Sequence, residues 1–188
     1  MTVTVEALLP VYSRREVHRR NYAATASEVR AVLEGLRPRD LPLTRALFAV
    51  RGLPLLLQGK SPFALVDLDR GGSLLEQTER AGFLRVVDNP TELVLVAIGR
   101  FWRPDGARVQ VSDREDFERF DQPGYAKAVW SFELNEQGTG TTELVTETRV
   151  LATDAGAARL LAAYWLLIRA GSGLIRREML AAVATKLR

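Results

Sequence analysis

The stretch from Ala152 to the C-terminus constrains the fold of this chain more than any other feature. It reads ATDAGAARLLAAYWLLIRAGSGLIRREMLAAVATKLR and is the longest helix-compatible run in the sequence. Every strand-like segment lies before it. The pattern therefore predicts an antiparallel sheet packed against one long C-terminal helical element, with a cavity between the two.

Two glycines divide this run. Before and after them, apolar side chains recur at helical spacing, at Leu160, Leu161, Tyr164, Leu167 and Ile168 and at Ile175, Met179, Ala182, Val183 and Leu187. Gly171 and Gly173 flank Ser172, and two glycines in a helix interior cost about 2 kcal/mol relative to alanine. We therefore expect two helices that meet at a sharp break. Thr153 or Asp154 would cap the first helix, and Ser172 the second.

Composition excludes several classes of function. The 188 residues contain no cysteine and one histidine, His18, which excludes disulfides, thiolate nucleophiles and multi-histidine metal sites. No metal or cofactor is therefore expected. The net charge is only +3, and the basic residues, mostly arginines, are scattered among acids. This distribution is typical of a solvated surface and argues against a nucleic-acid partner.

The sequence also lacks the usual signals for membrane insertion or export. No uncharged apolar run reaches about 18 residues, the length that a membrane-spanning helix needs. The segment MTVTVEALLPVYSRR lacks a basic lead followed by a long apolar core, so no signal peptide is expected. The resulting expectations are one domain over residues 1–188 and a cytoplasmic location.

The first part of the chain predicts one strand followed by two short helices. Residues 11–22 form the strand, and the arginines around His18 suit an edge strand with this histidine at the surface. Thr25 and Glu28 have the spacing of a capping box, and Pro38 ends the helix that follows. A second helix is expected at about residues 41–50.

A period of two dominates the middle of the chain. It predicts five further strands, at residues 83–87, 92–102, 108–111, 125–136 and 141–151. Residues 93–98 are apolar on both faces, so either another segment or a second subunit is expected to cover the outer face. Capping-box spacings, Ser73 with Glu76 and Ser112 with Glu115, predict short helices between the strands.

The order of these elements resembles the helix-grip fold of the START-like (SRPBCC) superfamily, which includes Bet v 1-like and polyketide cyclase-like proteins. Three local patterns are similar to those of a bacterial branch of that superfamily. They are GRFWRP at residues 99–104, DQPGYAKAVWSF at 121–132, and TETRVLATD at 146–154, which continues through YWLLIRAGSGLIRR at 164–177. The resemblance covers roughly residues 12–187.

The resemblance implies one α+β domain of the helix-grip type. Its curved antiparallel sheet, of about six or seven strands, would wrap around the C-terminal helix. It also implies a cavity for an apolar or amphipathic small molecule between the sheet and that helix. A soluble protein that binds such a molecule is therefore the first functional hypothesis. The interruption at Gly171–Gly173 departs from the single long helix that is usual in the superfamily.

Aromatic and charged side chains on the later elements are the candidates for ligand contacts. The lining candidates, each of which is also an ordinary core residue type, are Trp102, Trp130, Phe132 and Tyr164. Arg100 and Arg149 lie within apolar strands and could hold a ligand carboxylate, with Glu147 orienting one of them.

The role of these charges depends on which face of the sheet they occupy. Glu147 and Arg149 share one face of their strand. If that face lines the cavity, the charges are buried and must be paired, whereas on the opposite face they form a surface ladder. Alternation along this strand favours the surface ladder, because it turns Leu144, Thr146, Thr148 and Val150 inward. The same question applies to Lys127.

Two further hypotheses concern catalysis and assembly. A polyketide cyclase or dehydratase would need an acid–base group, and the candidates are Glu147 and Tyr164, with an arginine as oxyanion partner. That mechanism requires both side chains to face one cavity. A homodimer could form through the two-faced apolar strand at 93–98 and the nearly all-round apolar run at 160–168.

Overall fold

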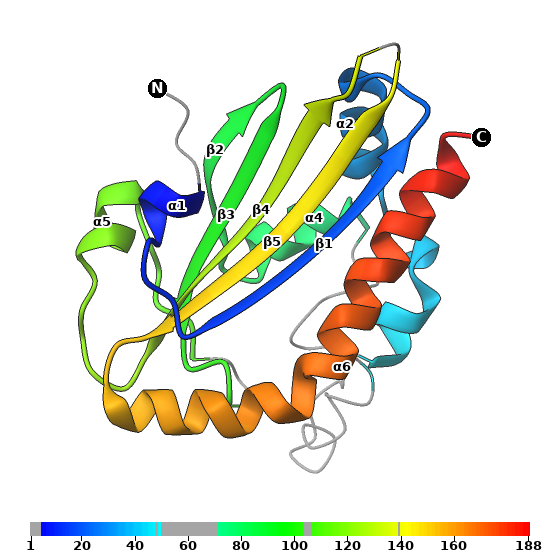
Figure 1. Cartoon of the computed structure of the whole chain (residues 1–188). Helices are drawn as coiled ribbons and strands as arrows, with labels where there is room; N and C mark the ends of the chain where they lie inside the picture. The colour runs from blue at the N-terminus through cyan, green and yellow to red at the C-terminus, as the bar shows by residue number, and fades with distance from the viewer. Residues whose placement is uncertain (1–4, 48, 50–70, 104–106, 139) are drawn as a thin grey trace.

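The computed structural model describes residues 5–47, 49, 71–103, 107–138 and 140–188. They form an α+β arrangement in which a five-stranded antiparallel open sheet packs against a long C-terminal helix (Figure 1). The sheet has the order β1-β5-β4-β3-β2. Its strands are β1 (Arg14–Tyr22), β2 (Leu84–Asn89), β3 (Glu92–Gly99), β4 (Ala126–Glu136) and β5 (Thr142–Ala152).

The described part of the sheet has fewer strands than the six or seven predicted from the sequence. The strand expected at 108–111 is reduced to an isolated bridge, in which the Val109 N–H donates to the Ile98 carbonyl at 2.9 Å. A short strand expected within 53–71 falls almost entirely outside the described residues. The remaining strands follow their predicted positions because their apolar residues alternate with the period of two that a sheet requires.

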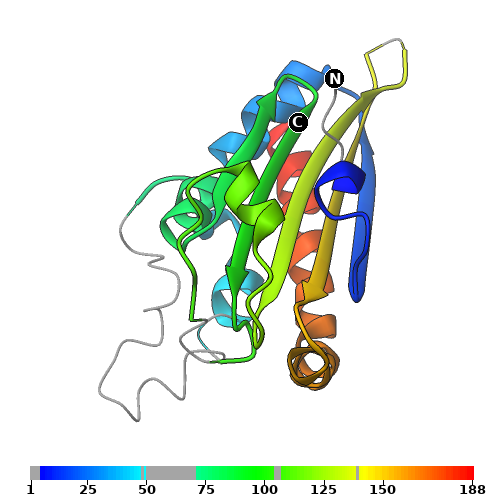
Figure 2. The ribbon, with the colours of Figure 1, turned by 90° about the vertical axis from the view of Figure 1, so that its left-hand side faces the viewer.

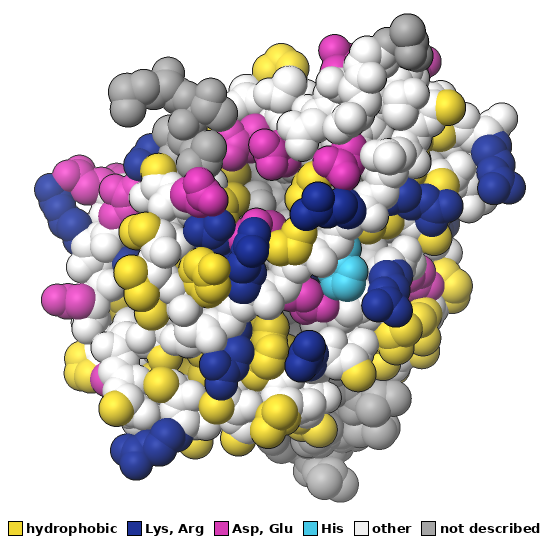
Figure 3. All heavy atoms as spheres, in the orientation of Figure 1, with side chains coloured by type: hydrophobic (Ala, Val, Ile, Leu, Met, Phe, Trp, Pro, Cys, Tyr) yellow, Lys and Arg dark blue, Asp and Glu magenta, His cyan; other side chains and the backbone are white. Residues whose placement is uncertain are grey.

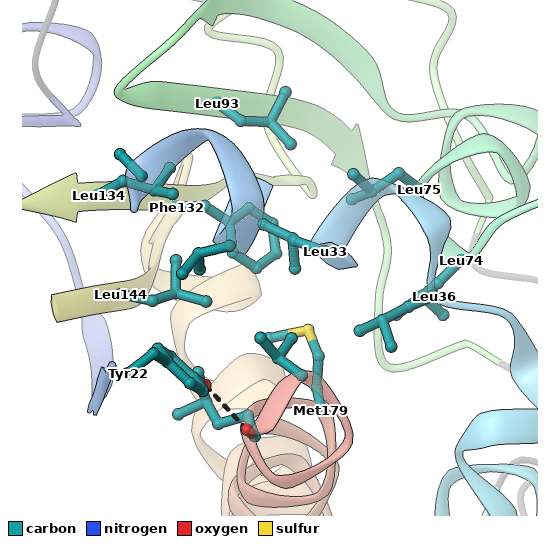
Figure 4. Packing of buried hydrophobic residues seen from close by; sticks show 14 of the residues in the cluster. Tyr22, Leu33, Leu36, Leu74, Leu75, Leu93, Phe132, Leu134, Leu144 and Met179 are labelled. Carbon is teal, nitrogen blue, oxygen red and sulfur yellow. Dashed lines mark hydrogen bonds between the residues drawn. The ribbon is translucent and has the colours of Figure 1, made fainter. Parts of the chain in front are cut away.

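One face of the sheet packs against helices α2 (Ala26–Gly35), α4 (Leu74–Arg80) and α6 (Ala155–Lys186). Figure 4 shows Phe132 and Leu144 of the sheet beside Leu33 of α2 and Met179 of α6. Tyr22 donates its hydroxyl to the Leu180 carbonyl at 2.8 Å, and burial raises the pKa of this phenol. These contacts fix the second half of α6 on the sheet.

The other face of the sheet is covered by two short helices, α1 (Val5–Leu8) and α5 (Arg114–Arg119). Figure 2 shows them together on the side of the sheet away from α6. Leu8, Leu9 and Phe117 pack there against Val94, Val96, Ile98 and Val129. Residues 93–98 are therefore apolar on both faces because each face has its own core. A second subunit is not needed to explain them.

Local capping explains where the short helices begin. The predicted capping boxes of Thr25 with Glu28 and of Ser73 with Glu76 are both present. The prediction for α5 is wrong by one residue, since Asp113 rather than Ser112 caps it. The Asp113 carboxylate accepts the backbone N–H of Asp116 at 2.9 Å. Residues 42–47 are helical within the predicted second helix, after a 3-10 turn at Pro38–Asp40.

The prediction of two separate C-terminal helices is wrong, whereas the sharp break that was predicted in this stretch is present as a change of direction within one helix. Helix α6 is one helix of 32 residues, and Asp154 caps it by accepting the N–H groups of Gly156 and Ala157. Figure 1 shows that the helix changes direction sharply near its middle without ending. The cost of two helical glycines is offset by packing, because both halves of α6 contribute side chains to buried clusters.

The prediction that Ser172 caps a second helix also fails. Its hydroxyl instead donates to Glu16 Oε2 of β1 at 2.8 Å. The neighbouring Gly173 explains this close approach, because a Cβ at that position would lie 3.0 Å from Glu16 Oε1. Gly173 thus allows the helix backbone to approach the edge strand β1 closely.

Candidate functional site

The structure places the predicted aromatic residues in two different hydrophobic clusters, both on the side of the sheet that faces α6. Trp130 and Phe132 lie side by side on β4, with ring centroids 4.8 Å apart. Phe132 is completely buried in the core that faces α2 and α6, so it is a packing residue. Trp102 and Tyr164 are only partly buried. They belong to a second cluster, in which the first half of α6, including Tyr164 itself, packs on the sheet; its buried members are Ala126, Ala128, Val150 and Leu161.

The predicted charges Glu147 and Arg149 lie on the opposite face, away from α6. Arg149 is 4% exposed, and its Nε lies 2.5 Å from Glu147 Oε1. Arg149 Nη1 also donates to the Leu9 carbonyl at 3.2 Å, so the segment after α1 covers it. The favoured face is therefore correct, but the expected surface ladder is wrong: this is a buried ion pair.

Glu147 also pairs with Arg15 of β1, whose Nε lies 2.7 Å from Glu147 Oε1. Burial by itself raises the pKa of Glu147, but hydrogen bonds from Arg15 and Arg149 outweigh burial and lower it. A carboxylate held ionised between two guanidinium groups is a structural link, and it has little basicity left for proton transfer.

Arg100 and Lys127 also have partners within the fold. The Arg100 guanidinium lies 4.5 Å from the centroid of the Tyr125 ring, although its shielded Nε, like that of Arg176, has no hydrogen-bond partner in the described part of the chain. The Lys127 ammonium donates to the Glu118 carbonyl at 2.9 Å and lies over the Phe117 ring, and burial lowers the pKa of Lys127. Arg100 therefore does not share a partner with Arg149, and the predicted pair of arginines around one carboxylate does not form.

The acid–base pair proposed from the sequence is separated by the sheet. Glu147 faces α1, whereas Tyr164 packs against Ala126 and Ala128 on the α6-facing side. The two side chains do not share a cavity. A cyclase mechanism that uses both Glu147 and Tyr164 requires them to face one cavity, so the structure does not meet its condition.

The structure reveals a polar group beneath α6 that sequence reasoning missed. We call it the Arg176 cluster, and its members are Glu16, His18, Thr148, Ser172 and Arg176. Arg176 of α6 donates from Nη2 to Thr148 Oγ1 of β5, and its guanidinium lies 4.5 Å from the centroid of the Trp130 ring. Glu16 of β1 accepts from Ser172 and lies 2.9 Å from His18 Nε2.

The electrostatics of Arg176 are unusual for an arginine. Among the described residues, no carboxylate lies within 4.0 Å of its nitrogens, because Glu16 is engaged by Ser172 and His18. Its Nε is shielded from solvent and has no hydrogen-bond partner among the residues that the structure describes. Burial lowers the pKa of Arg176 to about 10, although the charge of Glu16 acts in the opposite direction. The site thus holds a cation with unmet hydrogen-bonding capacity.

Two sequence signals could have identified this cluster. One face of the C-terminal helix carries small or apolar side chains at helical spacing, and Arg176 interrupts it. The positions on this face are Ser172, Arg176, Met179 and Val183. Glu16 and His18 share a strand face with the buried Tyr22. The expectation of a surface His18 is therefore wrong in part, since the side chain is half-buried beside Gly173 of α6.

Other parts of the described structure offer less to a ligand. Two open grooves of about 470 and 510 Å³ lie near the β4–β5 hairpin and share Glu136. Neither groove is lined by a residue of α6, so neither is the predicted cavity between the sheet and that helix. No group of three or more potential metal ligands occurs within the described part of the chain. The Arg176 cluster is therefore the strongest candidate site.

Comparisons with known proteins give the chain no family. No protein-family model matches it, no curated protein matches its sequence, and no solved structure matches its fold. The Arg176 cluster must therefore be interpreted from its own geometry.

Proposed function

We propose that this protein is a helix-grip binding protein for an amphipathic molecule with one acidic group, held between the sheet and α6. The observation that carries the proposal is the shielded Nε–H of Arg176, for which no described residue supplies an acceptor. A buried donor without a partner costs free energy comparable to a lost hydrogen bond. A ligand carboxylate would supply the acceptor and the countercharge together.

The surroundings of Arg176 suit the apolar part of such a molecule. The Trp130 ring lies under the guanidinium, and the next cross-strand row toward the start of α6 consists of Ala97, Ala128 and Val150. The row after it consists of Gly99, Ala126 and Ala152. These small side chains fill less space than the Leu and Phe residues of the adjacent core. Phe101, Trp102, Tyr164 and Trp165 pack on these rows in the structure, so an alkyl or ring system that extends from Arg176 would take the place of part of this aromatic layer.

His18 and Glu16 would restrict which acids bind. Glu16 repels a second negative charge, so a monoanion is favoured over a dianion. Ser172 and His18 hold the Glu16 carboxylate away from the guanidinium, which leaves Arg176 available. The specificity expected from this arrangement is for one carboxylate on an apolar body.

The test compares dodecanoate with dodecanol, which differ only in the acidic group. The wild-type protein should bind dodecanoate at least about tenfold more tightly, because a hydrogen bond to a charged group contributes about 1.5–3 kcal/mol. Arg176→Gln should remove this preference. Arg177→Gln is the matched control, since Arg177 is its exposed neighbour on the same helix. Equal binding of acid and alcohol by the wild type would refute the proposal.

A further inference from the structure

The first half of α6 carries apolar side chains that no other described segment covers. We call them the α6 stripe: Leu160, Ala163, Leu166, Leu167, Ala170 and Leu174. Leu166 and Leu167 are 80% and 82% exposed, and Leu160 is 53% exposed. Figure 3 shows hydrophobic side chains along the lower edge of the molecule, where this half of α6 runs. Exposed leucines at this density mark an interaction surface rather than an ordinary solvated helix face.

Helix α6 also satisfies the length and composition of a membrane-spanning helix. An 18-residue window within Ala155–Lys186 reaches a mean hydropathy of 1.2, and only 6% of that window is buried. Its second half, however, is fixed in the core through Met179, Leu180 and Val183. Leu161 of the first half is buried against the sheet as well. A helix held along the fold in this way can contact a bilayer with its outer side only.

Charge distinguishes between a second copy of the chain and a lipid surface as the partner. Residues 155–177 contain four arginines and no acidic residue, and Arg159 and Arg169 are exposed. In a twofold pair of α6 helices, these arginines would face a helix that offers no carboxylate along this stretch. Anionic lipid headgroups would supply the countercharge, and each nearby arginine strengthens such binding.

Aromatic side chains border the same region. Trp165 of α6 and Trp102 are partly buried in the cluster below the first half of α6. Tryptophan is favoured at the level of the headgroups, where its ring is apolar and its N–H remains hydrated. Exposed leucines, flanking arginines and bordering tryptophans together match a helix that lies in the plane of a membrane surface.

We propose that the first half of α6 docks the protein on an anionic lipid bilayer, with the α6 stripe entering the interface and Arg159 and Arg169 contacting headgroups. The inference does not depend on the ligand site, because none of these residues belongs to the Arg176 cluster. It describes peripheral binding, in which the fold stays intact.

Vesicle co-sedimentation tests this proposal with the full chain. Vesicles of equal parts phosphatidylcholine and phosphatidylglycerol should bind the protein, and vesicles of phosphatidylcholine alone should bind it far less. The double variant Leu166→Gln/Leu167→Gln should lose at least about tenfold in binding, since each buried leucine contributes strongly to transfer from water. Arg159→Gln/Arg169→Gln should lose about fivefold in binding per arginine and should reduce the sensitivity of binding to salt.

Leu43→Gln is the matched control, because Leu43 is an exposed leucine outside α6 and should bind like the wild type. Circular dichroism confirms that each variant keeps the fold, and light scattering without lipid gives the mass in solution. A failure to bind either kind of vesicle would overturn the proposal. A dimer that dissociates in the Leu166→Gln/Leu167→Gln variant would also overturn it, by showing that a second copy covers the stripe.

Discussion

The contact between α6 and β1 can be tested with two alanine substitutions that are two residues apart. Among the described residues, the Cβ that Gly171→Ala adds meets only Leu47, at 3.8 Å, which is an ordinary van der Waals contact. Alanine in a helix interior is about 1 kcal/mol more favourable than glycine. Gly171→Ala should therefore raise the free energy of unfolding by about 1 kcal/mol, or the Tm by about 2–4 °C for a chain of this size.

Gly173→Ala should behave differently although it makes the same chemical change. Its Cβ would lie 3.0 Å from Glu16 Oε1, which must then move and weaken the hydrogen bonds to His18 and Ser172. Glu16 Oε1 is the end of a flexible side chain, so a shift of a few tenths of an ångström weakens these hydrogen bonds, which contribute about 1.5–3 kcal/mol each, without removing them. We expect this loss to cancel the gain in helix propensity, so that Gly173→Ala changes the free energy of unfolding by less than about 0.5 kcal/mol.

Urea unfolding followed by circular dichroism measures both changes. A double-mutant cycle provides the control, because in a Glu16→Ala background Gly173→Ala should recover the stabilisation that glycine-to-alanine changes give in helices. If Gly173→Ala stabilises the wild type as much as Gly171→Ala does, the close contact between α6 and Glu16 is refuted.

Two further predictions concern buried carboxylates. Glu147→Gln should lower the free energy of unfolding by about 3 kcal/mol at pH 7, because it removes the nearest carboxylate from the buried Arg149 and leaves only the exposed Glu6, 3.6 Å away. Since the folded state lowers the pKa of Glu147, this contribution is present above the unfolded pKa of about 4.3 and is lost as the pH falls through the folded value. Urea titrations from pH 7 to pH 3 measure it, and a constant effect over that range would contradict the pairing. Glu92→Gln should have the opposite effect and raise the free energy of unfolding by about 1 kcal/mol at pH 7. Burial, and to a smaller extent the charge of Glu133, raises the pKa of Glu92, so the ionised carboxylate destabilises the fold. The gain should therefore disappear below about pH 4, where Glu92 is protonated. Destabilisation by Glu92→Gln at pH 7 would show that the carboxylate has a favourable partner.

Local signals in the sequence were sufficient for much of the fold. The capping boxes at Thr25 and Ser73 and the alternation of β4 and β5 depend on neighbouring residues, so the sequence reveals them directly. The continuity of α6 could not be predicted in this way. Its two glycines carry a local penalty, and only contacts with distant strands compensate for it.

The candidate site was missed for a related reason. Arg100, Glu147 and Arg149 stood out because charges in apolar strands are rare, but these residues have partners within the fold. Helix α1, which covers Arg149, has no periodic pattern that would predict it. Arg176 was overlooked because its role depends on the direction of α6 across β1 and β5, and sequence spacing does not give that direction.

The most direct test of the proposed function is the NMR signal of the Arg176 Nε–H in isotope-labelled protein, identified by its absence in Arg176→Gln. In the free protein, no described residue supplies an acceptor for this hydrogen. Addition of dodecanoate should shift the signal downfield and slow its exchange with water, whereas dodecanol should leave it unchanged. Saturation of the protein with dodecanoate without any change in this signal would contradict the central claim that Arg176 binds the acidic group of the ligand.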